Sequence, residues 1–153
     1  MTIRAAVNSD LSRLLEFEQG IVATERPFDP TLKPGEIHYY DLGELIKSPD
    51  SMVAVAELNG ELIGSGYAKI KIADDFLQHK EFAYLGCMYV EPEHRGKGVI
   101  QAITDYLFDW VRQRGLSEVR LDVYAENKTA VNSYTRMGFT PNLLEMRIAL
   151  QPE

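Results

Sequence analysis

The sequence predicts an α/β sandwich built on a mixed β-sheet, and three observations support this fold class. Two strand-like runs meet at Asn59-Gly60, which predicts an antiparallel hairpin in the middle of the chain. Helix-patterned segments separate strand-like runs in the second half, and such crossovers place strands parallel. The chain has 153 residues and is 45% hydrophobic, enough for one domain with its own core. The predicted order of elements is β-α-α-β-β-β-α-β-α-β.

The overall composition excludes several classes of protein. Sixteen basic and twenty-three acidic residues give a formal charge of −7, which argues against a nucleic-acid-coating surface. Cys87 is the one cysteine, so an internal disulfide and a cysteine metal cluster are both excluded. The N-terminus lacks the pattern of a signal peptide, and no run approaches the ~18 apolar residues of a membrane span. We therefore expect a soluble, cytoplasmic protein that binds neither nucleic acid nor membrane and holds no metal.

The N-terminal third should form one strand and two helices. Thr2–Ala6 is a short strand candidate, and Asn8 or Ser9 can cap the helix that follows. That helix should end before the segment RPFDPTLKPGE, because three prolines and a glycine force a loop. A shorter helix is expected over Asp41–Lys47.

The middle of the chain should be three strands. MVAVAEL and ELIGSGYAKIKI flank Asn59-Gly60, a dipeptide preferred where both turn residues need positive φ. The polar loop ADDFLQHK then leads to a third strand over Glu81–Val90.

The C-terminal half should alternate helices with strands. The apolar positions of a helix from about Gly98 to Arg114 lie on one face, and Gly115 is a suitable stop. The remaining predicted elements are a strand over Val119–Val123, a helix over Asn127–Met137 ended by Gly138, and a strand over Leu144–Leu150.

The turn EPEHRGKGVI, Glu91 to Ile100, is the strongest indication of a binding site. Strand, glycine-rich turn and helix is the arrangement that directs backbone N–H groups at an anion. A phosphate P-loop is excluded because Gly98 follows Gly96-Lys97 where serine or threonine is needed. Gly64-Ser65-Gly66 lies inside a strand pattern, so it is no dinucleotide fingerprint. An ordinary solvated turn is the alternative.

A second segment completes a recognisable pair. VEPEHRGKGVI and AENKTAVNSYTRMGF together resemble the cofactor-binding core of the GNAT superfamily of acetyl-CoA-dependent N-acetyltransferases. The matching motifs cover Val90 to Phe139, about a third of the chain, and the order of the other elements agrees with that fold. The resemblance implies one N-acetyltransferase domain over residues 1–153. It also implies a mostly antiparallel twisted sheet with splayed central strands and about four flanking helices.

The resemblance also implies site residues. The backbone of Met88 and Val90 would pair with the pantetheine arm of acetyl-CoA, and a backbone N–H near Met88 would stabilise the oxyanion. Asn127 would lie beside the pantetheine, and Tyr134 would protonate the leaving thiolate. The pyrophosphate would be held by the turn residues Arg95, Gly96, Lys97, Gly98, Val99 and Ile100. The plainer alternatives are a helix N-cap for Asn127 and core packing for Tyr134.

Three residues depart from the family pattern or invite another chemistry. Ile100 stands where glycine or alanine is usual, and its side chain either turns toward the sheet or crowds the pyrophosphate. Members of the family often carry a glutamate on the central strand, where this chain has Tyr84 and Gly86. Glu81 is then the candidate catalytic base, through a water relay, and a solvated carboxylate at the strand end is the alternative. Cys87 suggests a covalent intermediate, but no partner is identifiable and a buried structural thiol is favoured.

The acceptor should be a primary amine of a small molecule. In this fold ERPFDPTLKPGEIHYYD and ADDFLQHKE would wall the amine site; solvated acidic loops are the alternative. The candidate contacts are Glu25, Asp29, Glu36, Asp41, Asp74, Asp75, Phe28, Tyr39 and Tyr40. A protein amine as acceptor, a non-catalytic acyl-CoA-binding module and an α/β protein without CoA remain open. So does the oligomeric state, with a homodimer as one option.

Overall fold

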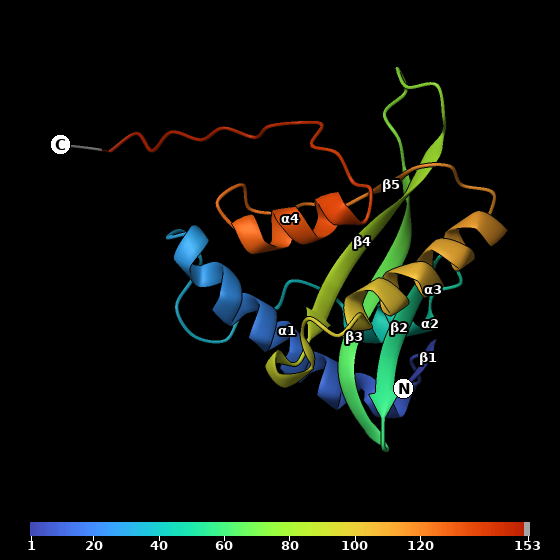
Figure 1. The fold of residues 1–153 in the computed structure, drawn as a ribbon. Coiled ribbons are helices and arrows are strands. Elements are labelled where there is room, and N and C mark those ends of the chain that lie inside the picture. Colours follow the sequence, from blue (N-terminus) through green and yellow to red (C-terminus); the bar gives the residue numbers. More distant parts are fainter. Residues whose placement is uncertain (152–153) are drawn as a thin grey trace. The chain divides into compact units, whose positions relative to one another are not determined.

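A computed structural model describes residues 1–151, shown as a ribbon in Figure 1. The residues group into two compact units, Met1–Asp122 and Val123–Glu153, which are described separately. The first unit holds one five-stranded sheet in the order β1-β2-β3-β4-β5, mixed and mostly antiparallel as predicted. Its strands are β1 Thr2–Ala5, β2 Ser51–Leu58, β3 Glu61–Ile72, β4 Glu81–Val90 and β5 Val119–Arg120. Its α-helices are α1 Leu11–Glu25, α2 Leu42–Lys47 and α3 Val99–Gln113.

The central hairpin forms as the sequence predicts. β2 and β3 pair in antiparallel register, with Leu58 opposite Glu61. Asn59 and Gly60 between them have φ values of 53° and 81°, the positive pair that this tight turn requires. The predicted bounds of β4 and α3 are also confirmed to within one residue.

The two faces of the sheet are covered by different helices. A Cβ placed on Gly64 or Gly66 would lie 3.1 Å or 3.0 Å from Ile103, so these glycines let α3 approach β3 closely. Residues on the opposite face of the central strands, Tyr67 and Cys87 among them, pack in one cluster with Leu14 and Phe17 of α1. The Gly64-Ser65-Gly66 segment therefore serves helix packing inside a strand.

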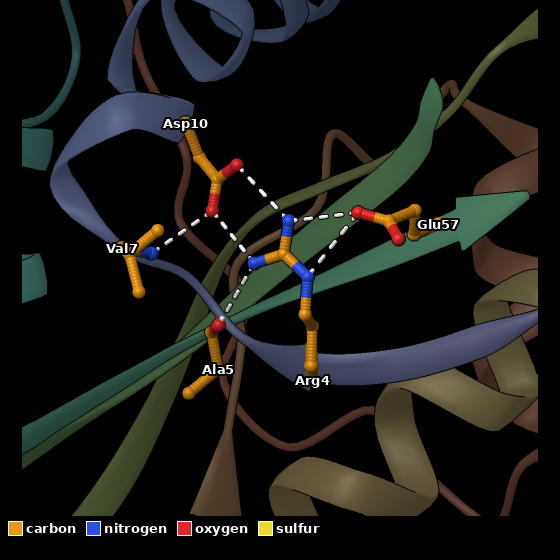
Figure 2. Close-up of polar contacts among 5 residues, drawn as sticks. All are labelled: Arg4, Ala5, Val7, Asp10 and Glu57. Carbon is orange, nitrogen blue, oxygen red and sulfur yellow. Dashed lines mark hydrogen bonds and ion pairs between the residues drawn. The ribbon is translucent and has the colours of Figure 1, made fainter. Parts of the chain in front are cut away.

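The start of α1 is fixed by an ionic contact that the sequence analysis did not find (Figure 2). The Arg4 guanidinium donates to the Asp10 carboxylate at 2.8 Å and to Glu57 at 3.0 Å. Asp10 also accepts a hydrogen bond from the Val7 N–H at 2.9 Å, and the Arg4 contact lowers the pKa of Asp10. The prediction that Asn8 or Ser9 caps α1 is wrong, because those residues form a 3-10 turn and Asp10 occupies the cap position, with its carboxylate bound to Arg4 and the Val7 N–H.

Strands β4 and β5 diverge after a short contact. Their parallel pairing joins Ala83 to Val119 and Tyr84 to Arg120, whereas β4 continues to Val90. The predicted strand over Val119–Val123 is therefore wrong in extent, since only its first two residues have a partner. The splayed central strands predicted from the family resemblance are confirmed.

The second unit contains α4, Lys128–Arg136. Asn127 caps this helix by accepting a hydrogen bond from the Ala130 N–H at 3.3 Å, and Gly138 follows it with a φ of 106°. The predicted strand over Leu144–Leu150 is wrong, because no ladder forms there and its alternating apolar side chains are exposed. No helix within residues 1–151 has the length and apolar character to cross a bilayer.

Candidate active site

The centre of the candidate site is a bulge in β4. The register between β3 and β4 shifts where Tyr67 pairs with Gly86 and Ser65 pairs with Tyr89. Within this bulge Cys87 has a φ of 52°, a left-handed conformation that non-glycine residues rarely adopt. The interruption of the ladder leaves backbone groups near Met88 unpaired with β3, which is where an oxyanion donor was predicted.

Beyond the bulge, β4 has one paired edge and one open edge. The Glu91 N–H donates to the Ile63 carbonyl at 2.8 Å, so odd-numbered residues here direct their backbone groups toward β3. By alternation, Met88 and Val90 direct theirs toward the edge where β5 has diverged. The Arg95 side chain lies at this edge and donates to the Val90 carbonyl at 2.7 Å.

β4 leads directly into the glycine turn that precedes α3. Gly96 and Gly98 have φ values of 73° and 84°, and no atom lies within 4 Å of a Cβ added to either. The first N–H groups of an α-helix have no intrahelical acceptor, so the start of α3 offers donors beside this open space. Val99 is buried and Ile100 half-buried, at the edge of the face that packs on the sheet. The predicted pyrophosphate residues are thus gathered in one turn, and they fit an anionic phosphate group.

In the second unit, Asn127 and Tyr134 lie at opposite ends of α4. The Asn127 carboxamide oxygen is engaged in the helix cap. The Tyr134 ring packs edge-to-face against Phe139, with ring centroids 5.8 Å apart. Asn127 therefore caps the helix and Tyr134 packs against a neighbouring ring, as the plainer alternatives expected. The cofactor roles of the two residues stay predictions.

Aromatic side chains gather over the β4 bulge, and the sequence analysis missed two of them. Tyr67 lies over Gly86, where an added Cβ would come within 2.4 Å of its ring. Its ring meets that of Tyr40 edge-to-face at 5.4 Å, and the Tyr40 hydroxyl is in hydrogen-bonding contact with the Cys87 backbone. Tyr84, on the same face, donates to Asp122 at 3.0 Å. The sequence of β3 places Tyr67, Lys69 and Lys71 on one face of the strand, but it does not indicate which helices cover that face.

These hydroxyls and the neighbouring thiol stay protonated at neutral pH. Burial raises the pKa of Tyr67 to about 12 and raises those of Tyr40 and Tyr84 further. Burial also raises the pKa of Cys87 to about 12, against a weaker opposing contact from Ser65. The phenols can therefore donate hydrogen bonds but cannot accept a proton, and Cys87 is a poor nucleophile.

A buried carboxylate holds the aromatic segment in place. Glu18 of α1 is 0% exposed and accepts hydrogen bonds from the backbone N–H groups of Tyr39 and Tyr40, at 2.7 Å and 3.0 Å. Its other oxygen contacts His38 Nδ1 at 2.8 Å. The hydrogen bond to Glu18 is the main cause that raises the pKa of His38 above its ordinary value of 6.5. Through these hydrogen bonds Glu18 holds residues 38–40 against α1, beside the bulge.

Glu25, one of the predicted acceptor contacts, lies at the last residue of α1. Burial raises its carboxyl pKa above the ordinary value of 4.5, while a contact with Tyr39 opposes that rise. Its charge is a minor cause of the raised pKa values of Tyr40 and Tyr84. Glu81 is exposed at the start of β4, six residues from Cys87, which is roughly 20 Å along an extended strand.

The other predicted acidic contacts have different surroundings. Asp29 is buried and accepts hydrogen bonds from Thr31 of its own loop, at 3.0 Å and 2.5 Å. Glu36 contacts His38, and Asp41 caps α2. Asp74 and Asp75 are exposed in the loop before β4. Within residues 1–151 no group of three histidine, cysteine or acidic side chains is placed to hold a metal ion.

Comparisons with known proteins agree with this arrangement. An uncharacterized N-acetyltransferase of Methanocaldococcus jannaschii is 30% identical over 95 residues, which are 62% of this chain and 42% of that protein. The chain spans less than half the length of the curated relatives it matches.

Solved structures show the same fold at low sequence identity. A tetramutant of the BH1408 protein from Bacillus halodurans is 16% identical, with a TM-score of 0.88 over 98% of this chain and all of that one. A predicted acetyltransferase from Clostridium acetobutylicum, solved with acetyl-CoA, is 19% identical, with a TM-score of 0.70 over 95% of each chain.

The family assignment rests on a longer match. The model of the Acetyltransferase (GNAT) family matches residues 17–139, which run from α1 through the β4 bulge and the glycine turn to the end of α4. This range contains both sequence motifs and every residue placed at the candidate site. The chain therefore belongs to the Acetyltransferase (GNAT) family.

Proposed function

We propose that this protein transfers the acetyl group of acetyl-CoA to a primary amine by direct attack in a ternary complex. The observation that carries the proposal is the continuity of β4. A bulged strand with an open edge leads straight into a glycine turn whose helix presents free N–H groups. A thioester with a pantetheine arm and a pyrophosphate matches these three features in order. The Clostridium acetobutylicum neighbour with acetyl-CoA supports the same ligand.

In this proposal each part of the cofactor has its own contacts. The backbone of Met88 and Val90 would pair with the pantetheine arm, Arg95 to Ile100 would surround the pyrophosphate, and Asn127 would orient the arm. A backbone N–H at the bulge would stabilise the tetrahedral oxyanion. A covalent acetyl-cysteine is not proposed, because Cys87 is 1% exposed and its pKa is raised to about 12.

The catalytic base in this proposal is Glu25 rather than Glu81. The amine must lose a proton as it attacks. Glu25 ends α1 and contacts Tyr39, the neighbour of Tyr40, whereas Glu81 lies at the far end of β4. Its raised pKa favours proton acceptance near neutral pH more than an ordinary carboxylate would. Tyr134 keeps its proposed role as the acid that protonates the thiolate. We prefer a small-molecule acceptor to a protein amine; the cytoplasmic location stays a prediction.

Binding of acetyl-CoA should raise the thermal unfolding midpoint. At about a hundred times the dissociation constant, ligand adds roughly 2.7 kcal/mol, or on the order of 5–10 °C for a chain of this size. Because Ile100 is half-buried at the edge of the packed face, the Ile100→Ala variant should bind at least as well. Differential scanning calorimetry with and without ligand tests this. A shift only in the variant would mean that Ile100 obstructs the turn, and no shift in either would refute the proposal.

The Tyr134→Phe variant should lower kcat by about tenfold. This is less than the usual range for a general acid, since a thiol of pKa near 8.5 leaves readily as a thiolate. The packing against Phe139 is retained by phenylalanine, so the unfolding midpoint should not change. Release of free CoA with a reactive amine measures the rate, and a variant as fast as the parent would remove Tyr134 from the mechanism.

A further inference from the structure

A cavity of about 270 Å³ opens on the α1–α2 face of the sheet, next to the β4 bulge. Its inner end is formed by Tyr40 and Tyr67, the two phenols that reach Cys87 and Gly86. Its walls include charged residues from two elements, Lys69 and Lys71 of β3 together with Asp41 and Glu44 at the start of α2. Tyr40 and Tyr67 therefore lie between this cavity and the bulge, and the rest of its lining carries both signs of charge.

The order of groups along the cavity follows from the alternation of β3. Tyr67, Lys69 and Lys71 share one face of the strand, and pairing places Tyr67 beside Gly86 and Lys69 beside Tyr84. Side chains two residues apart on one face are separated by about 7 Å. The two lysines thus follow the tyrosine at roughly 7 Å and 13 Å from the bulge end of the cavity.

The two lysines are available for an anion. Among residues 1–151 neither forms an ion pair, although Asp41 and Glu44 line the same cavity. The Lys71 ammonium instead lies over the Tyr84 ring, 4.0 Å from its centroid. Asp41 is already engaged, since its carboxylate caps α2 by accepting the Glu44 N–H at 3.2 Å. What distinguishes these two from the other lysines is that both line one cavity beside Tyr40 and Tyr67.

We propose that Lys69 and Lys71 form an anion subsite of the acceptor cavity, so that the preferred acceptor is a small amine bearing a carboxylate or phosphate. The amine would lie against the Tyr40 and Tyr67 rings, which contact each other edge-to-face, and the anionic end would lie between the two lysines. The spacing along β3 places the two ends of the acceptor roughly 7 to 13 Å apart. This inference rests on the proposed acetyl transfer, whose acceptor it narrows.

The test compares amines that differ only at the far end. CoA release is measured with 6-aminohexanoate, 5-aminopentyl phosphate, n-hexylamine and 1,6-diaminohexane. The anionic amines should show a kcat/KM about tenfold or more above that of n-hexylamine, a ratio equivalent to about 1.4 kcal/mol. The kcat/KM of the diamine should be no higher than that of n-hexylamine. Comparing kcat/KM for 6-aminohexanoate and 5-aminopentyl phosphate shows whether a carboxylate or a phosphate is preferred.

Charge-removing variants then locate the effect. In the Lys69→Gln/Lys71→Gln double variant, KM for the anionic amines should rise by about tenfold while kcat and the rate with n-hexylamine stay within about twofold. Lys47→Gln is the matched control, because Lys47 is an exposed lysine of the neighbouring α2 that does not line the cavity. A preference for anionic amines that persists in the double variant would overturn the subsite, as would a parent that prefers the plain amine or the diamine.

A separate measurement keeps the subsite testable if no amine is acetylated, a result that would count against the proposed function. Calorimetric titration of 6-aminohexanoate and of 5-aminopentyl phosphate into the parent with saturating CoA should show binding that the double variant loses and Lys47→Gln keeps. No binding of either probe to the parent would refute the subsite itself.

Discussion

Replacing Glu25 by glutamine should lower kcat by about a hundredfold near neutral pH, the low end of the range for a general base. A primary amine is protonated at this pH and must lose a proton to become a nucleophile, so removal of the base should cost more than removal of the acid. Glutamine keeps the size of the side chain and a contact with Tyr39, and the fold should be unaffected.

The pH profile separates a base from a structural carboxylate. Burial raises the pKa of Glu25, and a base acts only when ionised, so kcat/KM of the parent should fall as the pH drops through this raised value. The Glu25→Gln variant should lack that acidic limb. Glu81→Gln is the control, and we expect it to leave the rate and the profile unchanged. A rate loss confined to Glu81→Gln would restore Glu81 as the base.

Replacing Glu18 by alanine should lower the free energy of unfolding by about 3 kcal/mol. The change removes a fully buried carboxylate and leaves the N–H groups of Tyr39 and Tyr40 without their acceptor. It also releases the segment that brings Tyr40 to the bulge, so acetyl transfer should fall together with stability. Denaturant unfolding and CoA release measure the two effects.

Two control variants isolate the role of the Glu18 oxygens. Glu18→Gln keeps an oxygen that can accept both N–H groups but loses the charge and the oxygen that contacts His38, so about 1 kcal/mol should be lost. Glu16→Ala, at an exposed position of the same helix, should change stability by less than about 0.5 kcal/mol. Equal losses in Glu18→Ala and Glu16→Ala would mean that residues 38–40 are held by other contacts.

Much of the fold was predictable from the sequence because the responsible signals are local. Asn59-Gly60 determines the hairpin through positive φ values that few other residues adopt. The bounds of α3 follow from its apolar face and from Gly98 and Gly115 at its ends. The glycine turn was readable for the same reason, since a strand, two glycines and a helix start are contiguous in the chain.

The sequence-based prediction was wrong where an element depends on distant partners. Val119–Val123 and Leu144–Leu150 both alternate as strands do, but a strand exists only where a neighbouring backbone is in register. The capping prediction at Asn8 and Ser9 was wrong because the Asp10 carboxylate binds the Arg4 guanidinium. The pairing of β1 with β2 determines where Arg4 lies.

The sequence by itself determined the family, the turn predicted for the cofactor and the strand that leads to it, since each is encoded in neighbouring residues. Only the tertiary structure decided what surrounds the bulge. Glu18, Glu25, Tyr40, Tyr67 and the two lysines come from one helix, a loop and a strand, over some fifty residues of sequence. Their convergence depends on which sheet face α1 and α2 cover, and that is set by burial of the whole core rather than by local pattern.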